Sequence, residues 1–309
     1  MYKKDKQEPL TPQAMQMSTA KLFEYMQQQN FESLEELNEF FAKNVVGKRI
    51  DEILPEENGP KSAEGQSDDL MYEAYNSNRL KGLQLAKKAL ELNPENVRAI
   101  TFLADNEPQK KLALKLYKQA VDAGAKQLGT SFFKENTGYF WGLVQTRPFM
   151  TAKFGYANCL FAMKKTDEAI AEYAELLTLN PNDNQGVRYN FAGVLLFCKR
   201  FSAFFELYKK YKDEPTTFWN FNYALYLFAT EGASMKAKMA LVKANKQNKY
   251  VVQFMIEQKK IDLYDDNYYS PGDESEASAY LIDTLEAWVA CPGALEWVKD
   301  FVEKGMKPK

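Results

Sequence analysis

Residues 167–183 read DEAIAEYAELLTLNPND, and the spacing of alanine around this stretch decides the fold. Ala169, Ala203 and Ala237 lie 34 residues apart along the chain. A period of 34 is typical of a repeat unit made of two antiparallel helices joined by a tight turn. We therefore predict an all-helical chain built from stacked helix hairpins.

Helix packing explains why alanine and proline recur. Where the second helix of a hairpin crosses the first, the closest approach leaves room only for a small side chain, so alanine is expected at tight crossings. Proline has no N–H to continue a helix, and it ends the second helix. Pro181 and Pro215 repeat with the same 34-residue step as the alanines, which strengthens the predicted period.

The best repeat unit covers residues 150–183. Within it, Ala169, Tyr173, Leu176 and Pro181 stand at the offsets that the tetratricopeptide repeat uses, and here the chain resembles that family. The resemblance implies a right-handed superhelical array of tetratricopeptide-like hairpins, an α-α superhelix. Proteins with such arrays present the first helices of their hairpins as a concave groove.

The same register predicts two further units, at 184–217 and 218–251, so that residues 150–251 hold three repeat units. Both of the later units diverge from the pattern. Lys210 replaces the small residue usual late in the second helix, and no proline closes the last unit.

Residues 68–124 are expected to form two more hairpins that are also divergent. Ala89 lies near the end of the second helix of the first hairpin, while Ala113, Tyr117 and Ala120 are in step in the next. The spacing between these two hairpins is shortened, which predicts that one helix has lost most of a turn.

Helices are also predicted on either side of the repeats. Residues 1–54 are expected to form N-terminal helices, and the aromatic residues of 125–149 indicate a helical insertion. Residues 252–309 are expected to form C-terminal capping helices, which cover the exposed face of a last repeat. Residues 55–67 are rich in Pro, Gly, Glu and Ser and predict a linker.

Two capping patterns mark where flanking helices begin. Ser33 with Glu36 is a capping-box signature, and Gly47 is the predicted stop for that helix. Asp273 with Glu276 predicts the start of a C-terminal helix.

A second pattern lies near the C-terminus, in Gly272, Asp273, Glu276, Ala277, Trp288, Gly293, Ala294 and Leu295. These residues resemble the suppressor of tumorigenicity 7 family, in which a repeat helix leads into a Gly-Asp-x-x-Glu-Ala turn and a Trp-containing helix. The resemblance extends with gaps over residues 112–298 and implies a repeat fold with a helical cap. The membrane-spanning segments of the eukaryotic members have no counterpart in this sequence.

Charge and hydropathy argue against two classes of partner. The chain has 40 basic and 42 acidic residues, interspersed to a net charge of -2, which gives no strong field for nucleic acid or anionic lipid. No segment approaches the roughly 20 apolar residues that span a bilayer, and the N-terminus lacks the apolar stretch of a secretory signal. We predict neither nucleic-acid nor membrane binding.

Cysteine and histidine content bear on location and chemistry. Cys159, Cys198 and Cys291 are too few and too dispersed for a disulfide framework, which favours a reducing compartment and a cytoplasmic location. Histidine is absent, so the commonest general base and the commonest zinc ligand are missing. We predict no catalytic site, no metal and no cofactor.

The predicted function is a non-catalytic scaffold or adaptor that binds a protein or peptide in the concave groove. Asparagine and arginine there can hydrogen-bond an extended peptide or its carboxylate, and aromatic residues can supply apolar anchors. The sequence identifies neither the partner nor the oligomeric state. The candidate groove residues are Asn158, Arg188, Tyr189, Trp219, Asn222 and Tyr226.

Alternatives stay open at this stage. The inserted helix or the C-terminal cap can fill the groove, in which case the aromatic residues are core. The chain can instead be a structural or self-assembling module. An enzyme would need a pocket with carboxylate, tyrosine or lysine groups beside the aromatic insertion Phe132 to Trp141.

Two polar stretches also have two interpretations. Asn180 to Asn190 can contact a ligand, but a link between repeats in which Asn and Asp cap the next helix is favoured. The acidic run from Asp262 to Glu276 lacks the ligand spacing of a helix-loop-helix calcium site, so a solvated loop is favoured over a metal site.

Overall fold

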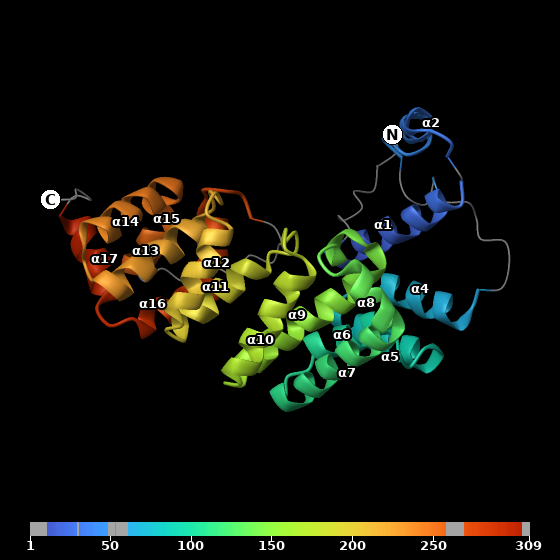
Figure 1. Ribbon diagram of the computed structural model, residues 1–309. Helices are drawn as coiled ribbons and strands as arrows, with labels where there is room; N and C mark the ends of the chain where they lie inside the picture. The colour runs from blue at the N-terminus through green and yellow to red at the C-terminus, as the bar shows by residue number, and fades with distance from the viewer. Residues whose placement is uncertain (1–10, 30, 49–52, 54–60, 258–268, 305–309) are drawn as a thin grey trace, which may run out of the picture. The chain divides into compact units, whose positions relative to one another are not determined.

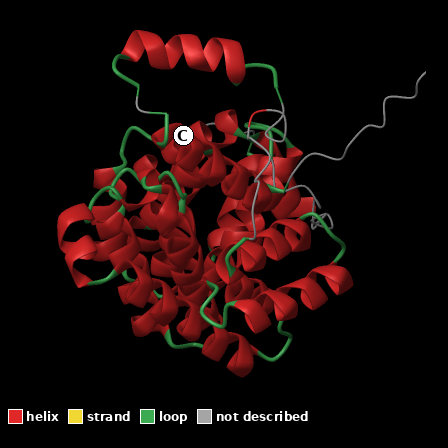
Figure 2. Ribbon diagram, turned by 90° about the vertical axis from the view of Figure 1, so that its right-hand side faces the viewer, coloured by secondary structure: helices red, strands yellow, loops and turns green. Residues whose placement is uncertain are grey.

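The computed structural model describes residues 11–29, 31–48, 53, 61–257 and 269–304. In these residues there are sixteen α-helices and no strand, and Figure 2 draws helices and loops alone for them. The predicted all-α class is confirmed. The chain divides into two units, which are described separately: residues 1–163 with 178–181, and residues 164–177 with 182–309.

Unit 1 holds the helices from α1 to α9 (Figure 1). They are α1 (Pro12–Gln27), α2 (Leu34–Asn44), α4 (Ala63–Tyr75), α5 (Arg79–Leu92), α6 (Val97–Asp105), α7 (Lys110–Leu128), α8 (Thr130–Asn136) and α9 (Arg147–Ala162), with short 3₁₀ helices η1 (Phe140–Gly142) and η2 (Val144–Thr146) before α9. Helices α4 and α5 pack as one hairpin and α6 and α7 as the next, with α9 packed on α7 and α6.

Unit 2 begins with most of α10 and runs to the C-terminus. Its helices are α10 (Thr166–Leu179), α11 (Val187–Phe197), α12 (Phe201–Lys210), α13 (Thr217–Glu231), α14 (Met235–Gln247), α15 (Lys249–Glu257), α16 (Glu274–Ala290) and α17 (Ala294–Glu303). Helices α11 and α12 pack against each other, as do α13 and α14, and α15 to α17 form the predicted C-terminal helices.

Four of the second helices bury the same three positions, each four and then three residues apart. This spacing places the positions on one face of a helix, where small residues permit a close crossing. The sets are Gly82, Ala86 and Ala89; Ala113, Tyr117 and Ala120; Ala169, Tyr173 and Leu176; and Ala237, Leu241 and Ala244, all buried except the half-buried Tyr117.

Helix α12 departs from this register. Ala203 is exposed, so the prediction that it lies at a tight crossing is wrong. Phe204 and Leu207 are buried instead. The Phe204 ring lies 5.2 Å from that of Tyr226 on α13, so an aromatic contact replaces the small residue that the period predicts in α12.

The crossing of α4 and α5 shows why a small residue is needed. A Cβ added at Gly82 would lie 2.7 Å from Phe102 Cζ and 3.0 Å from the backbone oxygen of Ala74. Any side chain there would push the two helices apart.

The predicted helix starts are confirmed at both ends of the chain. Ser33 Oγ accepts a hydrogen bond from the Glu36 N–H at 3.1 Å and caps α2. Asp273 Oδ1 accepts from the N–H groups of Ser275 and Glu276 and caps α16.

The helix boundaries in the structure differ from two of the predicted segment boundaries. Residues 63–67, assigned to the linker 55–67, form the start of α4, whose N-cap is Ser62; residues 55–60 lie outside the described residues. In the insertion 125–149, α7 continues to Leu128 and α9 begins at Arg147. The aromatic insertion does contribute to the core, through the buried ring of Phe140, which contacts the ring of Phe149.

Candidate functional site

In unit 2, the C-terminal helix α16 covers the face where a peptide was expected to bind. Helix α16 packs on α11 and α13, the first helices of their hairpins. A Cβ added at Gly193 of α11 would lie 3.2 Å from the backbone oxygen of Asp283 and 3.3 Å from Thr284 Cγ2, both on α16. At this separation no other chain fits between α11 and α16.

Buried hydrogen bonds hold α16 in this position. Tyr280 donates its hydroxyl to Asn222 Oδ1 at 3.1 Å, and Trp288 Nε1 donates to the Tyr280 hydroxyl at 2.7 Å. Glu276 accepts from the Thr217 hydroxyl at 2.7 Å. Because buried polar groups are expensive to leave unpaired, these contacts make α16 a fixed part of unit 2. Burial also raises the pKa of Tyr280, which therefore stays a neutral hydroxyl.

Two of the predicted groove residues lie in the core. Trp219 is 1% exposed and Asn222 is 0% exposed, so neither is accessible to a ligand in this fold. The Trp219 ring lies 6.0 Å from the rings of Tyr208 and Tyr211. The prediction that these two residues face an open groove is corrected. Asn222 is covered by α16, through its hydrogen bond with Tyr280, and Trp219 is packed among the rings of Tyr208 and Tyr211.

Tyr226 and Asn158 lie elsewhere. Tyr226 is half-buried in a stack of aromatic rings, 5.5 Å from the Phe205 ring with an interplanar angle of 10°. Asn158 is half-buried on α9 and belongs to unit 1, whereas the other five candidates belong to unit 2.

Arg188 and Tyr189, the remaining candidates, are parts of an ionic cluster. Arg188 donates from Nη1 to Asp183 Oδ2 at 2.9 Å and from Nη2 to Glu214 Oε2 at 2.7 Å. Its Nη2 also donates to the Tyr189 hydroxyl at 2.8 Å, and that hydroxyl donates to Glu214 Oε1. The guanidinium is thus occupied by groups of its own unit, so a peptide carboxylate would have to displace Glu214 or Asp183.

The loop from Asn180 to Asn190 has the predicted structural role. Asp183 accepts hydrogen bonds from the N–H groups of Val187 and Arg188 at 2.8 Å each, which satisfies the first turn of α11. The Asp183 side chain is fully buried, and burial raises the pKa of its carboxyl despite the hydrogen bonds from Arg188.

A cleft of about 470 Å³ adjoins this loop within unit 2. Its one carboxyl outside the ionic cluster is that of Asp283, an exposed residue of α16 that lines the cleft. Desolvation raises the pKa of Asp283 to about 6, and a hydrogen bond from Asn190 offsets part of that rise. The lining includes Asn184, Gln185, Tyr189, Phe218, Tyr269 and Asp283.

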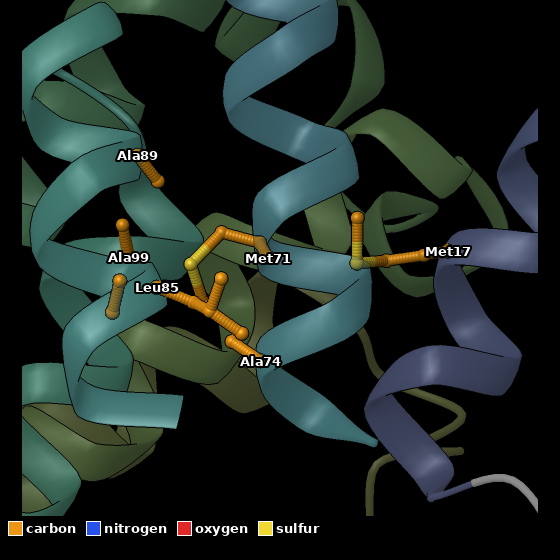
Figure 3. Close-up of a cluster of buried hydrophobic side chains, with 7 residues drawn as sticks. Met17, Met71, Ala74, Leu85, Ala89 and Ala99 are labelled. Carbon is orange, nitrogen blue, oxygen red and sulfur yellow. The ribbon is translucent and has the colours of Figure 1, made fainter. Parts of the chain in front are cut away.

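Unit 1 carries a different arrangement on its first helices. The N-terminal helix α1 packs against α4 and η2. Ala14 and Met17 are its buried apolar residues, and Met17 joins a cluster with Met71 and Ala74 of α4 (Figure 3). Lys21 Nζ donates to Asp69 Oδ1 at 2.7 Å. The surface of α4, α6 and the start of α9 that faces α1 is called the inner face of unit 1 below.

A cavity of about 810 Å³ lies between α1 and the inner face of unit 1. Met17 and Lys21 line it from α1, and Asn96, Phe132 and Phe149 line it from the rest of the unit. Within residues 1–54, the sequence analysis specified only the helix that follows Ser33, so it did not predict α1 or this contact. Two signals were present: Thr11 before Pro12 marks a helix start, and Ala14, Met17 and Lys21 share one helix face.

The carboxylate of Asp69, which lines this cavity, is bound in ion pairs. Asp69 accepts from Lys21 at 2.7 Å and from Lys61 at 2.5 Å. Burial alone would raise the pKa of Asp69, but the two lysines lower it below the ordinary value. An aspartate held ionised in this way is a poor proton acceptor near neutral pH.

The cysteines and acidic residues give no reactive or metal-binding group in the part of the chain that the structure describes. Burial raises the pKa of all three thiols, which disfavours the reactive thiolate. Clusters of three or more potential metal ligands do not occur among the described residues. Of the acidic run, Asp262 lies outside those residues, while Asp273 and Glu276 make the hydrogen bonds given above.

None of the described helices has the length and apolar character needed to cross a membrane. In comparisons with known proteins, the chain matches no family model and no curated protein. The resemblances to tetratricopeptide repeat proteins and to the suppressor of tumorigenicity 7 family therefore rest on the sequence patterns.

Proposed function

We propose that this protein is a non-catalytic scaffold of tetratricopeptide-like hairpins that binds a segment of a partner protein on the inner face of unit 1. The observation that carries the proposal is the packing of α1. This helix of the same chain already lies on that face and contacts it through Ala14, Met17 and Lys21. A surface that holds one such helix has the shape and chemistry to hold another.

The repeated register supports the hairpin architecture. Gly82, Ala113, Ala169 and Ala237 begin the same three-position pattern in four helices, as expected if successive hairpins stack in one fixed way. A right-handed superhelical arrangement of these hairpins is part of the proposal, as is a cytoplasmic location.

The binding role moves from unit 2 to unit 1 for an energetic reason. The face of α11 and α13 is closed by α16 with buried hydrogen bonds, whereas α1 has only three buried residues. A partner competes more easily with the less buried helix.

Site-specific photo-crosslinking tests the scaffold. A benzophenone amino acid is placed at Gln145, an exposed residue lining the unit 1 cavity, and in a second protein at Lys115, an exposed residue of α7 outside it. Crosslinking in the cells of origin should join a partner at position 145 and not at 115. Equal yields at both positions, or no protein partner at 145, would contradict the proposal.

A further inference from the structure

The contacts of α1 define what kind of segment the inner face of unit 1 accepts. Ala14, Met17 and Lys21 stand at positions i, i+3 and i+7, which fall on one side of a helix. Ala14 and Met17 are buried, and Lys21 reaches the Asp69 carboxylate. The inner face of unit 1 thus accommodates a small residue, a long flexible apolar residue and a cation at fixed positions along a bound helix.

Helix α1 covers the inner face of unit 1 incompletely. Of its 16 residues, only Ala14, Met17 and Ser18 are buried. A cavity of about 810 Å³ remains beside it, with Phe132 and Phe149 in the lining. The buried Ser18 hydroxyl finds no hydrogen-bond partner within the described residues, which weakens the packing of α1 further. A helix with larger apolar residues would bury more surface in the same place.

The ion pair makes the exchange of α1 inexpensive. Asp69 is shared between Lys21 and Lys61, so it keeps one cation when α1 leaves. Lys61, which also lowers the pKa of Asp69, remains beside the carboxylate, which is therefore available to accept a new basic residue. A departing α1 therefore strands no unpaired buried charge, the usual penalty for separating an ion pair.

We infer that α1 is a removable occupant of this face, and that the partner which replaces it is an amphipathic helix with a small, a long apolar and a basic residue at i, i+3 and i+7. The inference rests on the proposed scaffold function and names both its ligand class and its regulation. In the absence of a partner, α1 closes the site from within the same chain.

The test uses the full chain and a fluorescent peptide of residues 11–28, TPQAMQMSTAKLFEYMQQ, whose binding is measured by fluorescence anisotropy. A tethered α1 competes at an effective concentration of about 1 mM, so wild-type chain should bind the peptide weakly. The Met17→Asp chain, whose α1 cannot seat, should bind at least about tenfold more tightly. The matched Met15→Asp chain changes an exposed methionine of the same helix and should bind as wild type does.

A second pair of variants covers the case in which Met17→Asp fails to fold. Lys21→Glu places a negative charge against Asp69 and should also raise peptide affinity, whereas Thr19→Glu, on the exposed side of α1, should not. A peptide that itself carries Met17→Asp should bind none of these chains. Equal peptide affinity in the buried-site and exposed-site variants overturns the inference.

The outcomes separate this inference from the scaffold function. If a partner crosslinks at Gln145 and the peptide does not block the crosslink, the scaffold function is supported, but the inference that the partner is an amphipathic helix is rejected. Peptide binding without position-specific crosslinks would reject the scaffold. Light scattering on wild type and Met17→Asp identifies a third outcome: a dimer lost in the variant would show that the occupant is a second copy of this chain, which also overturns the inference.

Discussion

Trp219 illustrates how an aromatic residue suited to ligand binding becomes part of a core. Its ring is surrounded by those of Tyr189, Tyr208 and Tyr211, at centroid distances of 6.0 to 6.3 Å. The indole N–H has no hydrogen-bond partner among the described residues, so packing alone holds the side chain. Removing the Trp219 side chain would therefore leave a cavity and would break no hydrogen bond.

Replacing Trp219 by alanine should therefore destabilise the fold strongly. We expect the free energy of unfolding to fall by about 3–5 kcal/mol, measured by urea denaturation followed by circular dichroism. Tyr139→Ala removes an exposed aromatic ring and should change it by less than about 0.5 kcal/mol. A loss near zero for Trp219→Ala would mean that the ring is dispensable for packing, as a ligand contact would be.

The raised pKa of Asp283 predicts how the stability of the fold changes with pH. Its pKa in the fold, about 6, lies above that of an unfolded aspartate, so the folded chain binds this proton more tightly. The stabilisation is fully present below about pH 4 and is lost as the pH rises through 6. Asp283→Asn should thus raise the melting temperature relative to wild type at pH 7.5 and match it at pH 4. Glu286→Gln, an exposed change on the same helix, is the control; a pH-independent difference would contradict the assignment.

At the scale of helices, the crossing of α4 and α5 depends on the missing side chain of Gly82. Phe102 could rotate away from an added Cβ, but the Ala74 carbonyl oxygen at 3.0 Å belongs to the backbone of α4 and cannot move alone. By contrast, a Cβ at Gly65, in the first turn of α4, meets its nearest atom at an ordinary 3.5 Å.

These two glycines make a matched test of the crossing. Gly82→Ala should lower the free energy of unfolding by about 1–2 kcal/mol, because overpacking outweighs the helix propensity gained. Gly65→Ala gains propensity without a clash and should be neutral or stabilising by up to about 1 kcal/mol. Thermal unfolding of both variants measures the difference, and equal effects would show that α4 and α5 are not in close contact at Gly82.

The sequence predicted the helices well where a local rule determines them. The Ser33 and Asp273 caps depend on residues two or three positions away, and the small residues at 169 and 237 are buried as the period predicts. Ala203 matched the same spacing, yet Phe204 takes the buried position, because the aromatic rings of α13 are its neighbours. A period alone cannot reveal which of two adjacent residues packs better.

The candidate groove failed because it depended on a distant helix. Whether Asn222 faces solvent is decided by α16, more than fifty residues further along the chain, while Trp219 is buried by aromatic residues of the preceding hairpin. A signal did exist, since Glu276, Tyr280 and Thr284 put three polar residues on one face of α16 at steps of four. Polar residues on a helix face that packs inward require polar partners, and Thr217 and Asn222 supply them.

At the scale of the whole molecule, the division into two units falls after Met163, inside the repeat that fits the sequence pattern best. Each unit has its own core. In unit 1 the buried clusters contain Met71 and Ala86 in one case and Ile100 and Ala152 in the other. Unit 2 is built around large aromatic residues such as Trp219.

Because the two units have separate cores, a substitution that destabilises one unit should leave the stability of the other unchanged. In native-state hydrogen exchange, Trp219→Ala should accelerate exchange across the helices α11 to α17, because their opening shares one core. Protection in α4 to α7 should stay within twofold of wild type, since Trp219 contributes nothing to the clusters around Met71 and Ile100. The reciprocal variant Met71→Ala should accelerate exchange in α4 to α7 alone. If either substitution raised exchange in both sets of helices equally, the chain would open as a single cooperative unit, and a partner bound at α1 would then be expected to stabilise α11 to α17 as well.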